Sequence, residues 1–300
     1  MFKPGYIFEK IIYRLLLVSG WKRDVVQANL NFVHSNPSKV IYTKEYRQII
    51  SNLSRHVSEI LFDFGSFKRL PLDFSSYPFK QNLITYKLAD GSEPVLDKMR
   101  KGGIFLTAHY GNYEAMGPWL CRLGIPLVAS YIPVKPKWLI YILERKIRSV
   151  DGRSYSVDAR TPRDFLRILN DGKLFCLLAD QDSRIPSAID GTLLGQPANI
   201  NPLPDFLLKH RPQTPVFICW MEELGASPKE TSTKCASLKK VRVLHAIEVV
   251  GAQSKIVSST ESCVVNSQFN KWLELRIAEN PNLWYSWTHR RFYSREPGIY

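Results

Sequence analysis

A histidine and a glutamate five residues apart, His109 and Glu114, are the residues of this 300-residue chain best suited to acid–base chemistry. An imidazole titrates near neutral pH and can take a proton from a hydroxyl group. A carboxylate on its other ring nitrogen would fix the tautomer and stabilise the imidazolium. On one continuous helix, a five-residue gap would turn the two side chains about 140° apart. A strand, a turn at Gly111 and Asn112, and a helix start would instead bring them together.

The same segment also has a purely structural interpretation. Asn112 is a preferred N-cap residue, and Glu114 in the first turn would favour the helix dipole without any role in catalysis. The residue types alone leave both interpretations open.

Short apolar runs alternate with helical segments from about residue 83 onward. Residues 103–108 form a continuous apolar run that ends at His109, and residues 113–123 follow with helical spacing. Further strands are predicted at residues 125–132, 155–157, 174–179, 216–221 and 241–250, and further helices at residues 137–149, 162–171 and 267–279. Residues 185–204 hold four prolines and are predicted to form an ordered loop. The alternation predicts an α/β fold with a central, mostly parallel sheet flanked by helices.

The first 80 residues are predicted to form an N-terminal membrane-surface and helical lead-in region, followed by an α/β domain at residues 81–300. Residues 25–62 have the spacing of helices. Before them, apolar and basic residues recur as on a helix that lies in an anionic membrane interface, although packing on the protein's own core is an equal alternative. The apolar members are Tyr6, Ile7, Ile11, Leu15 and Val18, and the basic ones are Lys3, Lys10, Arg14, Lys22 and Arg23. The apolar run is shorter than the roughly 18 residues of a membrane span.

The composition limits the function classes. An excess of 41 Lys and Arg over 27 Asp and Glu gives a net charge of +14, which favours anionic partners such as acidic lipids, nucleic acid or an acidic carrier protein. The five cysteines are widely spaced and form no C-x-x-C pair, so neither a disulfide framework nor a zinc site is expected. The signatures of serine hydrolases, P-loop proteins and dinucleotide-binding proteins are absent from the sequence.

The segment 109–114 reads HYGNYE and resembles the His-x-x-x-x-acid motif of the lysophospholipid acyltransferase superfamily. Its glutamate form is similar to the bacterial lipid A biosynthesis acyltransferases, which add lauroyl or myristoyl chains. Four more segments match that family in order, so the resemblance covers nearly the whole chain. They are residues 20–30, Arg148 with Ser149, residues 179–182 and residues 287–292.

The resemblance implies a glycerolipid acyltransferase-like fold with no metal or cofactor. It implies transfer of a fatty acyl chain from an acyl-carrier-protein thioester to a hydroxyl of a lipid A precursor or related glycolipid, as in lipopolysaccharide synthesis. His109 would be the general base, oriented by Glu114. Arg148, Asp180 and Asp182 would bind the sugar and phosphate of the acceptor. The protein would be peripheral or monotopic at the cytoplasmic face of the bacterial inner membrane.

Two departures from the family pattern leave other functions open. The N-terminal anchor is short and charged, and Pro202 and Pro204 replace a stretch usually rich in Thr and Gly. The acceptor could therefore be another lysolipid or a phosphatidylinositol mannoside, and coenzyme A could replace the carrier protein. A non-catalytic protein that binds membrane or nucleic acid is the alternative from another class. No nucleic acid partner is expected, because the basic residues are dispersed and no nucleic-acid-reading motif is present.

Overall fold

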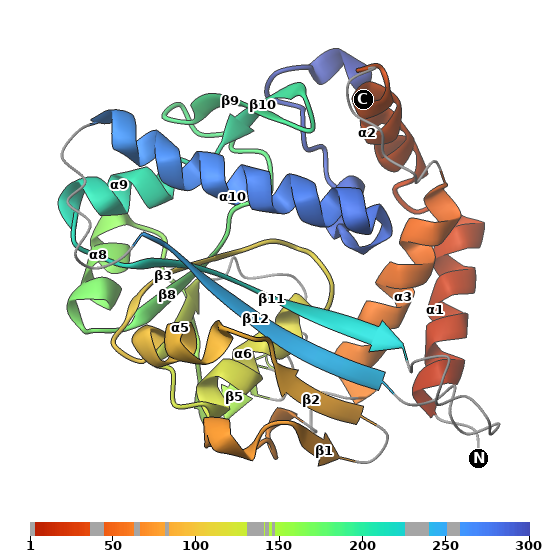
Figure 1. Ribbon diagram of the computed structural model, residues 1–300. Helices are drawn as coiled ribbons and strands as arrows, with labels where there is room; N and C mark the ends of the chain where they lie inside the picture. Colours follow the sequence, from red (N-terminus) through yellow and green to blue (C-terminus); the bar gives the residue numbers. More distant parts are fainter. Residues whose placement is uncertain are drawn as a thin grey trace.

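The computed structural model describes most of the chain (Figure 1). The described residues are 4–36, 45–62, 67–81, 84–130, 141, 144–145, 148–225, 240–250 and 259–300. The helices are α1 (Pro4–Ser19), α2 (Arg23–His34), α3 (Tyr46–Phe62), α5 (Ser92–Met99), α6 (Tyr113–Arg122), α8 (Pro162–Asn170), α9 (Leu203–His210) and α10 (Ser259–Glu279), with short 3-10 turns η1 (Phe74–Ser76), η5 (Pro281–Leu283), η6 (Tyr285–Thr288) and η7 (Pro297–Ile299). The strands are β1 (Phe79–Gln81), β2 (Ile84–Leu88), β3 (Gly103–Thr107), β4 (Leu127–Ser130), β5 (Ser149–Val150), β6 (Arg153–Ser154), β7 (Ser156–Val157), β8 (Leu174–Leu178), β9 (Ile189–Leu193), β10 (Gln196–Ile200), β11 (Val216–Gly225) and β12 (Lys240–Val250).

The central sheet has the strand order β1-β2-β12-β11-β3-β8-β4-β7. Its pairs are parallel except for β1 with β2 and β11 with β12. The predicted α/β class with a mostly parallel sheet is therefore confirmed.

Helices cover both faces of the sheet (Figure 1), so the central strands β3 and β8 are buried at nearly every position. Along β3, Ile104 and Leu106 face one hydrophobic cluster, which also receives α8, α9 and α10, while Phe105 faces the other, which receives α5 and α6. The alternation follows from the two-residue period of a strand. The sheet is thus the middle of three layers, and its buried centre fixes where the carboxyl ends of β3 and β8 lie.

The predicted loop at residues 185–204 is wrong. It contains the antiparallel hairpin of β9 and β10, followed by the start of α9. Leu194 and Gly195 form the turn, both with positive φ. Two of the four prolines mark a helix start, since Pro202 is the N-cap of α9 and Pro204 lies in its first turn.

The strand predicted at 125–132 is confirmed as β4, Leu127–Ser130, and residues 131 and 132 lie outside the described residues. Most of the helix predicted at 137–149 also lies outside the described residues, and its last residue, Ser149, belongs to β5. The closing helix, predicted at 267–279, is longer, because α10 begins at Ser259.

The N-terminal helices predicted within residues 25–62 are confirmed as α2 and α3, whereas the division at residue 80 remains a prediction. Helix α1 lies beside α3 (Figure 1), which confirms packing on the protein's own core, while binding at a membrane interface stays a prediction. One side packs against the core through Tyr13, Leu16 and Leu17. Another side leaves apolar residues exposed, namely Ile7, Ile11, Leu15 and Val18. Within the described ranges, no helix is both long and apolar enough to cross a membrane.

A glycine in the middle of α6 is needed for close packing against Tyr155. A Cβ atom on Gly117 would overlap the Tyr155 ring, with Tyr155 Cζ only 2.5 Å away. We expect Gly117→Ala to lower the free energy of unfolding by about 1–3 kcal/mol, although alanine is the better helix former by about 1 kcal/mol. Denaturant titration measures this change. The same substitution should cost less in a Tyr155→Leu background, and equal costs in both backgrounds would contradict the steric explanation.

Candidate active site

His109 and Asp180 meet because two neighbouring parallel strands end at the same level. Thr107, the last residue of β3, pairs with Leu178, the last residue of β8. His109 and Asp180 each lie two residues beyond the end of their strand. They are therefore at the carboxyl edge of the sheet, where open α/β sheets place their sites. His109 Nδ1 lies 2.8 Å from Asp180 Oδ1. The structure therefore brings together two of the predicted site residues in a histidine–carboxylate pair.

The hydrogen bonds around His109 define its tautomer. Asp180 Oδ2 already accepts the Trp284 Nε1–H at 2.9 Å and the Ser286 hydroxyl at 2.6 Å, so the carboxylate is surrounded by donors. His109 Nδ1 must then carry a proton, which leaves Nε2 as the acceptor. The Gln181 side-chain nitrogen lies 3.4 Å from that Nε2 and can donate to it.

Opposing effects set the charges of this pair. Burial favours a neutral His109, but the Asp180 carboxylate, with a smaller contribution from Glu114, raises the pKa of His109 above its ordinary value. Burial would likewise raise the pKa of Asp180, but His109 and the hydrogen bonds from Ser286 and Trp284 hold that pKa below its usual range. Asp180 is therefore an anion, and His109 is a stronger base than a free imidazole.

The residues near the C-terminal end of the chain complete the site. The segment around η5 and η6 lies beside the residues that follow β3. Tyr285 N–H donates to the His109 carbonyl at 2.8 Å, Gly111 N–H donates to the Leu283 carbonyl at 3.0 Å, and Tyr110 forms a β-bridge with Trp284. This placement brings the Trp284 and Ser286 side chains onto Asp180.

Glu114 does not hydrogen-bond to His109, so the expectation that it orients the imidazole is corrected. It forms a two-point ion pair with Arg148, in which Nη2 donates to Oε1 at 2.7 Å and Nε donates to Oε2 at 3.3 Å. From the first turn of α6, Glu114 reaches the residue before β5, and both its carboxylate oxygens are occupied there. The guanidinium of Arg148 is thus held by a carboxylate, and Glu114 raises its pKa against the effect of burial, while a role of Arg148 in binding substrate stays a prediction.

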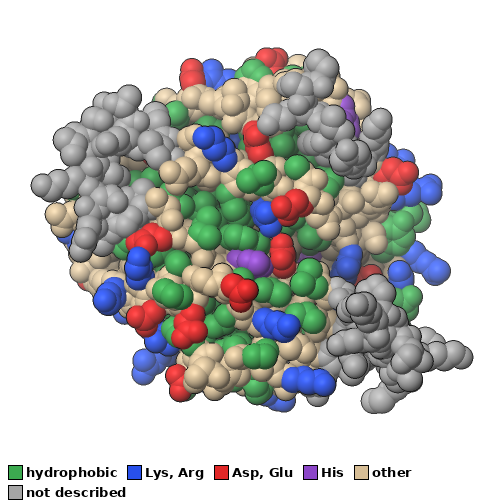
Figure 2. Space-filling model, viewed as in Figure 1, with side chains coloured by type: hydrophobic (Ala, Val, Ile, Leu, Met, Phe, Trp, Pro, Cys, Tyr) green, Lys and Arg blue, Asp and Glu red, His purple; other side chains and the backbone are tan. Residues whose placement is uncertain are grey.

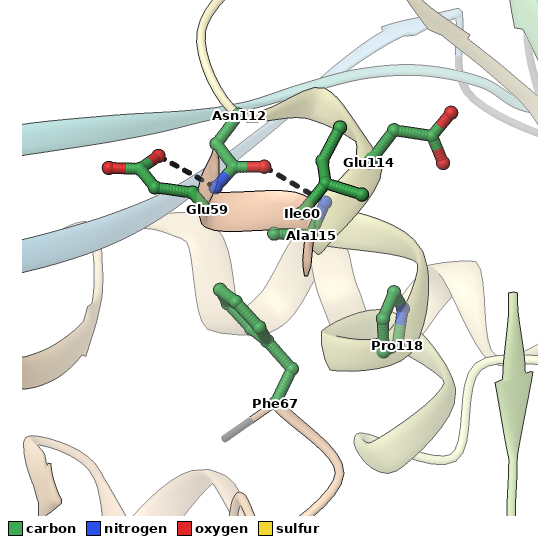
Figure 3. A pocket seen from close by; sticks show the side chains of 7 residues that line it. All are labelled: Glu59, Ile60, Phe67, Asn112, Glu114, Ala115 and Pro118. Carbon is green, nitrogen blue, oxygen red and sulfur yellow. Dashed lines mark hydrogen bonds between the residues drawn. The ribbon is translucent and has the colours of Figure 1, made fainter. Parts of the chain in front are cut away.

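Asn112 and Glu59 hold the start of α6 (Figure 3). The Asn112 side chain accepts the Ala115 N–H at 3.3 Å, which confirms the cap, and donates to Glu59 Oε2 at 3.0 Å. Figure 3 shows that Glu59 and Glu114 extend in opposite directions from this junction. Glu59 also pairs with Lys240 at 2.7 Å. Glu59, Asn112 and Glu114 line a small pocket. Its other lining residues are Ile60, Phe67, Ala115 and Pro118.

Asp182, also expected to bind substrate, has a different position. Its Oδ2 accepts the Ser294 N–H at 3.2 Å and the Ser294 hydroxyl at 2.8 Å, and Arg184 lies 3.4 Å away. Asp182 therefore fastens the C-terminal segment, and a role in binding substrate stays a prediction. In the described part of the chain, no three His, Cys, Asp or Glu side chains converge as metal ligands.

Two residues of the site were missed from the sequence. Trp284 and Ser286 lie more than 100 positions beyond Asp180 along the chain, and no local motif links them to it. The signal in the sequence is the aromatic-rich segment that begins near residue 284. The resemblance stated from the sequence covers that segment only from residue 287.

The comparisons with known proteins leave the family unassigned. No family model matches the chain, and no curated protein matches it. Among solved structures, the 1-acyl-sn-glycerophosphate (LPA) acyltransferase PlsC from Thermotoga maritima aligns over 92% of this chain and 96% of its own. The sequence identity is 12% and the TM-score 0.36. A similarity at this level assigns no activity, and the fold class rests on the sheet and helices described above.

Proposed function

We propose that this protein is an acyltransferase in which His109 acts as general base directly on the acceptor hydroxyl, with Asp180 as its orienting partner. One observation carries the proposal. A buried carboxylate holds Nδ1 of His109, while the side chain of His109 is 22% exposed. In the neutral ring with Nδ1 protonated, Nε2 is the acceptor. Among the described residues, no serine, threonine or cysteine side chain hydrogen-bonds to His109, so the nucleophile is supplied by the substrate.

The reaction balances without a covalent enzyme intermediate. The acceptor oxygen attacks the carbonyl carbon of the thioester while His109 Nε2 takes its proton. The new C–O bond forms, the C–S bond breaks, and the imidazolium returns the proton to the departing thiolate. Asp180 stabilises the imidazolium during this cycle because it is a buried anion at hydrogen-bond distance.

We further propose an acyl-carrier-protein thioester as the donor and a hydroxyl of a lipid A precursor or related glycolipid as the acceptor. The ordered set of sequence segments supports this choice, and the net charge of +14 suits both an acidic carrier and an anionic lipid surface. Figure 2 shows Lys and Arg mixed with Asp and Glu around a hydrophobic centre on the face that it displays. This mixture does not favour nucleic acid, which needs a continuous basic surface.

Mass spectrometry of the products tests the proposal. Purified full-length protein is incubated with acyl carrier protein or coenzyme A thioesters and, in turn, a lipid A precursor, a lysophospholipid and a phosphatidylinositol mannoside. We expect one acyl chain to be added to the lipid A precursor from the carrier protein. No transfer to any acceptor, together with salt-sensitive DNA binding, would reject the enzyme in favour of a binding protein.

Arg148 is expected to contact an acceptor phosphate, with its guanidinium positioned by the ion pair with Glu114. Lysine keeps the charge but loses the planar fork, so Arg148→Lys should raise the acceptor KM about tenfold, which corresponds to about 1.4 kcal/mol. Steady-state kinetics that vary donor and acceptor separately check this. The increase should persist in a Glu114→Gln background. A lower melting temperature with an unchanged acceptor KM would reduce Arg148 to a structural partner of Glu114.

The exposed apolar stripe of α1 is expected to bind a lipid surface. Ile7, Ile11, Leu15 and Val18 fall within about 80° of one another at 100° per residue, and Lys10 and Arg14 flank them. Leu15 is 65% exposed, and burying a leucine in lipid contributes roughly 1.5–3 kcal/mol. Leu15→Gln should therefore weaken binding to anionic vesicles at least about tenfold in a sedimentation assay.

A matched control is available for this test. Leu275 on α10 is 61% exposed, so Leu275→Gln removes a comparable apolar side chain at another place. If both substitutions weaken vesicle binding equally, α1 is not the membrane-binding element.

A further inference from the structure

A second buried histidine, His56 on α3, lies within two aromatic contacts of His109. Its ring stacks on Tyr285 with centroids 4.8 Å apart and planes 19° apart. On another side it packs against Tyr113 with centroids 5.0 Å apart. His56 therefore joins one residue of α6 to one residue of η6.

Both neighbours of His56 also hold His109. The Tyr113 ring meets the His109 ring edge-on, with centroids 5.1 Å apart. The Tyr285 N–H donates to the His109 carbonyl at 2.8 Å. His56 is therefore linked to His109 in two ways. Through Tyr113 it is linked to the His109 ring, and through Tyr285 it is linked to the His109 main chain.

The polar atoms of His56 do not explain its burial. Only 3% of the residue is exposed, and neither ring nitrogen has a hydrogen-bond partner among the described residues. Burial lowers the pKa of His56 to about 4, with Glu114 opposing and His109 adding to the shift. The imidazole is thus a neutral ring at neutral pH that makes its contacts through its faces, and a buried polar group without a partner needs an explanation.

We infer that His56 is a positioning residue for His109, because its ring, wedged between Tyr113 and Tyr285, keeps both in contact with the proposed base. The inference rests on the proposed function for its kinetic consequence alone. Removal of the ring leaves Tyr113 and Tyr285 free to move, so the imidazole loses its fixed orientation toward Asp180. A displacement of about 1 Å at a reacting group lowers turnover by as much as roughly 100-fold.

Three substitutions at His56 distinguish the effect of aromatic stacking from the effect of side-chain volume. His56→Ala removes the ring, His56→Phe keeps an aromatic ring without nitrogens, and His56→Leu fills the space without a ring. We expect His56→Ala and His56→Leu to lower kcat at least tenfold with KM values for donor and acceptor within about twofold of wild type. His56→Phe should retain wild-type turnover. If His56→Ala does not fold, the comparison of His56→Leu with His56→Phe decides the question.

The control is His245→Ala, which removes a histidine stacked on Trp220 with centroids 4.6 Å apart, on β12. It should change the melting temperature without a loss of kcat. Nitrogen-15 NMR of the histidine rings adds a measurement that needs no substrate. His109 should show one tautomer in wild type and in His56→Phe, and exchange between tautomers in His56→Ala or His56→Leu.

Two results would overturn the inference. One is a ring-deleted variant with wild-type kcat and an unchanged His109 spectrum, which would make His56 an ordinary packing residue. The other is a His56→Phe variant as impaired as His56→Ala, which would assign the effect to the ring nitrogens. If the wild-type protein transfers no acyl chain, the proposed function fails, but the NMR comparison still tests the positioning of His109.

Discussion

His109→Ala is expected to lower the rate of acyl transfer by about two to four orders of magnitude, the usual contribution of a general base. The loss should appear in kcat, because the imidazole acts on the proton that moves in the transition state. The wild-type rate should fall as the pH drops through the pKa of His109, which Asp180 raises above its ordinary value, since only the neutral imidazole accepts a proton. Single-turnover assays with a labelled thioester measure both effects.

A second histidine serves as the control for this experiment. His210 on α9 is exposed and bonds only to the Phe206 carbonyl among the described residues, so His210→Ala should transfer acyl chains at the wild-type rate. A His109→Ala variant with wild-type activity would contradict the proposed mechanism. Equal losses of activity in His109→Ala and His210→Ala would indicate a defect in folding instead of in catalysis.

Asp180→Asn is expected to cost about three to four orders of magnitude in kcat, as the same change does in a Ser-His-Asp triad. The carboxylate accepts from His109, Trp284 and Ser286. An amide has one accepting oxygen, so its NH2 group must face at least one of these groups. If it faces His109, the imidazole adopts the opposite tautomer and Nε2 becomes protonated, so it can no longer accept the hydroxyl proton.

The pH dependence separates this explanation from simple unfolding. Without the carboxylate, the pKa of His109 should fall, so the acid limb of the residual activity should move to lower pH. Asp205→Asn is the control, because Asp205 is a half-buried carboxylate on α9, whose pKa burial raises to about 6. A fully active Asp180→Asn variant, or an unshifted profile, would show that Asp180 does not act through His109.

The elements around the site could be predicted from the sequence because their signals are local. The apolar runs that end before His109 and Asp180 are long enough to be recognised as buried strands. Which strands are neighbours is a property of the whole sheet. The identity of the partner of His109 therefore could not be read from the spacing to Glu114, which is close in sequence but holds Arg148 instead.

The hairpin of β9 and β10 shows a different reason for error. The prolines of this segment predict a loop, yet Pro197 lies within β10, opposite Thr192. The signal for a hairpin is the Leu194-Gly195 turn between two five-residue segments, both of which alternate in burial. The hairpin buries Leu193, Ala198 and Ile200 against the core. Its strands also contain Asp, Gly, Pro and Asn, which are depleted in strands, so the strand signal in the sequence is weak.

The hydrogen bonds of the C-terminal segment determine when the site can form during synthesis of the chain. Asn29 on α2 donates to the carbonyls of Trp287 and His289 and accepts from the Tyr300 hydroxyl. The same segment supplies two of the three donors that fix Asp180. A ribosome-bound chain that has emerged only as far as α10 thus holds the base and its carboxylate but lacks the groups that orient them. Under the proposed function, the nascent protein would become reactive toward thioesters only after the residues that follow α10 have emerged and folded.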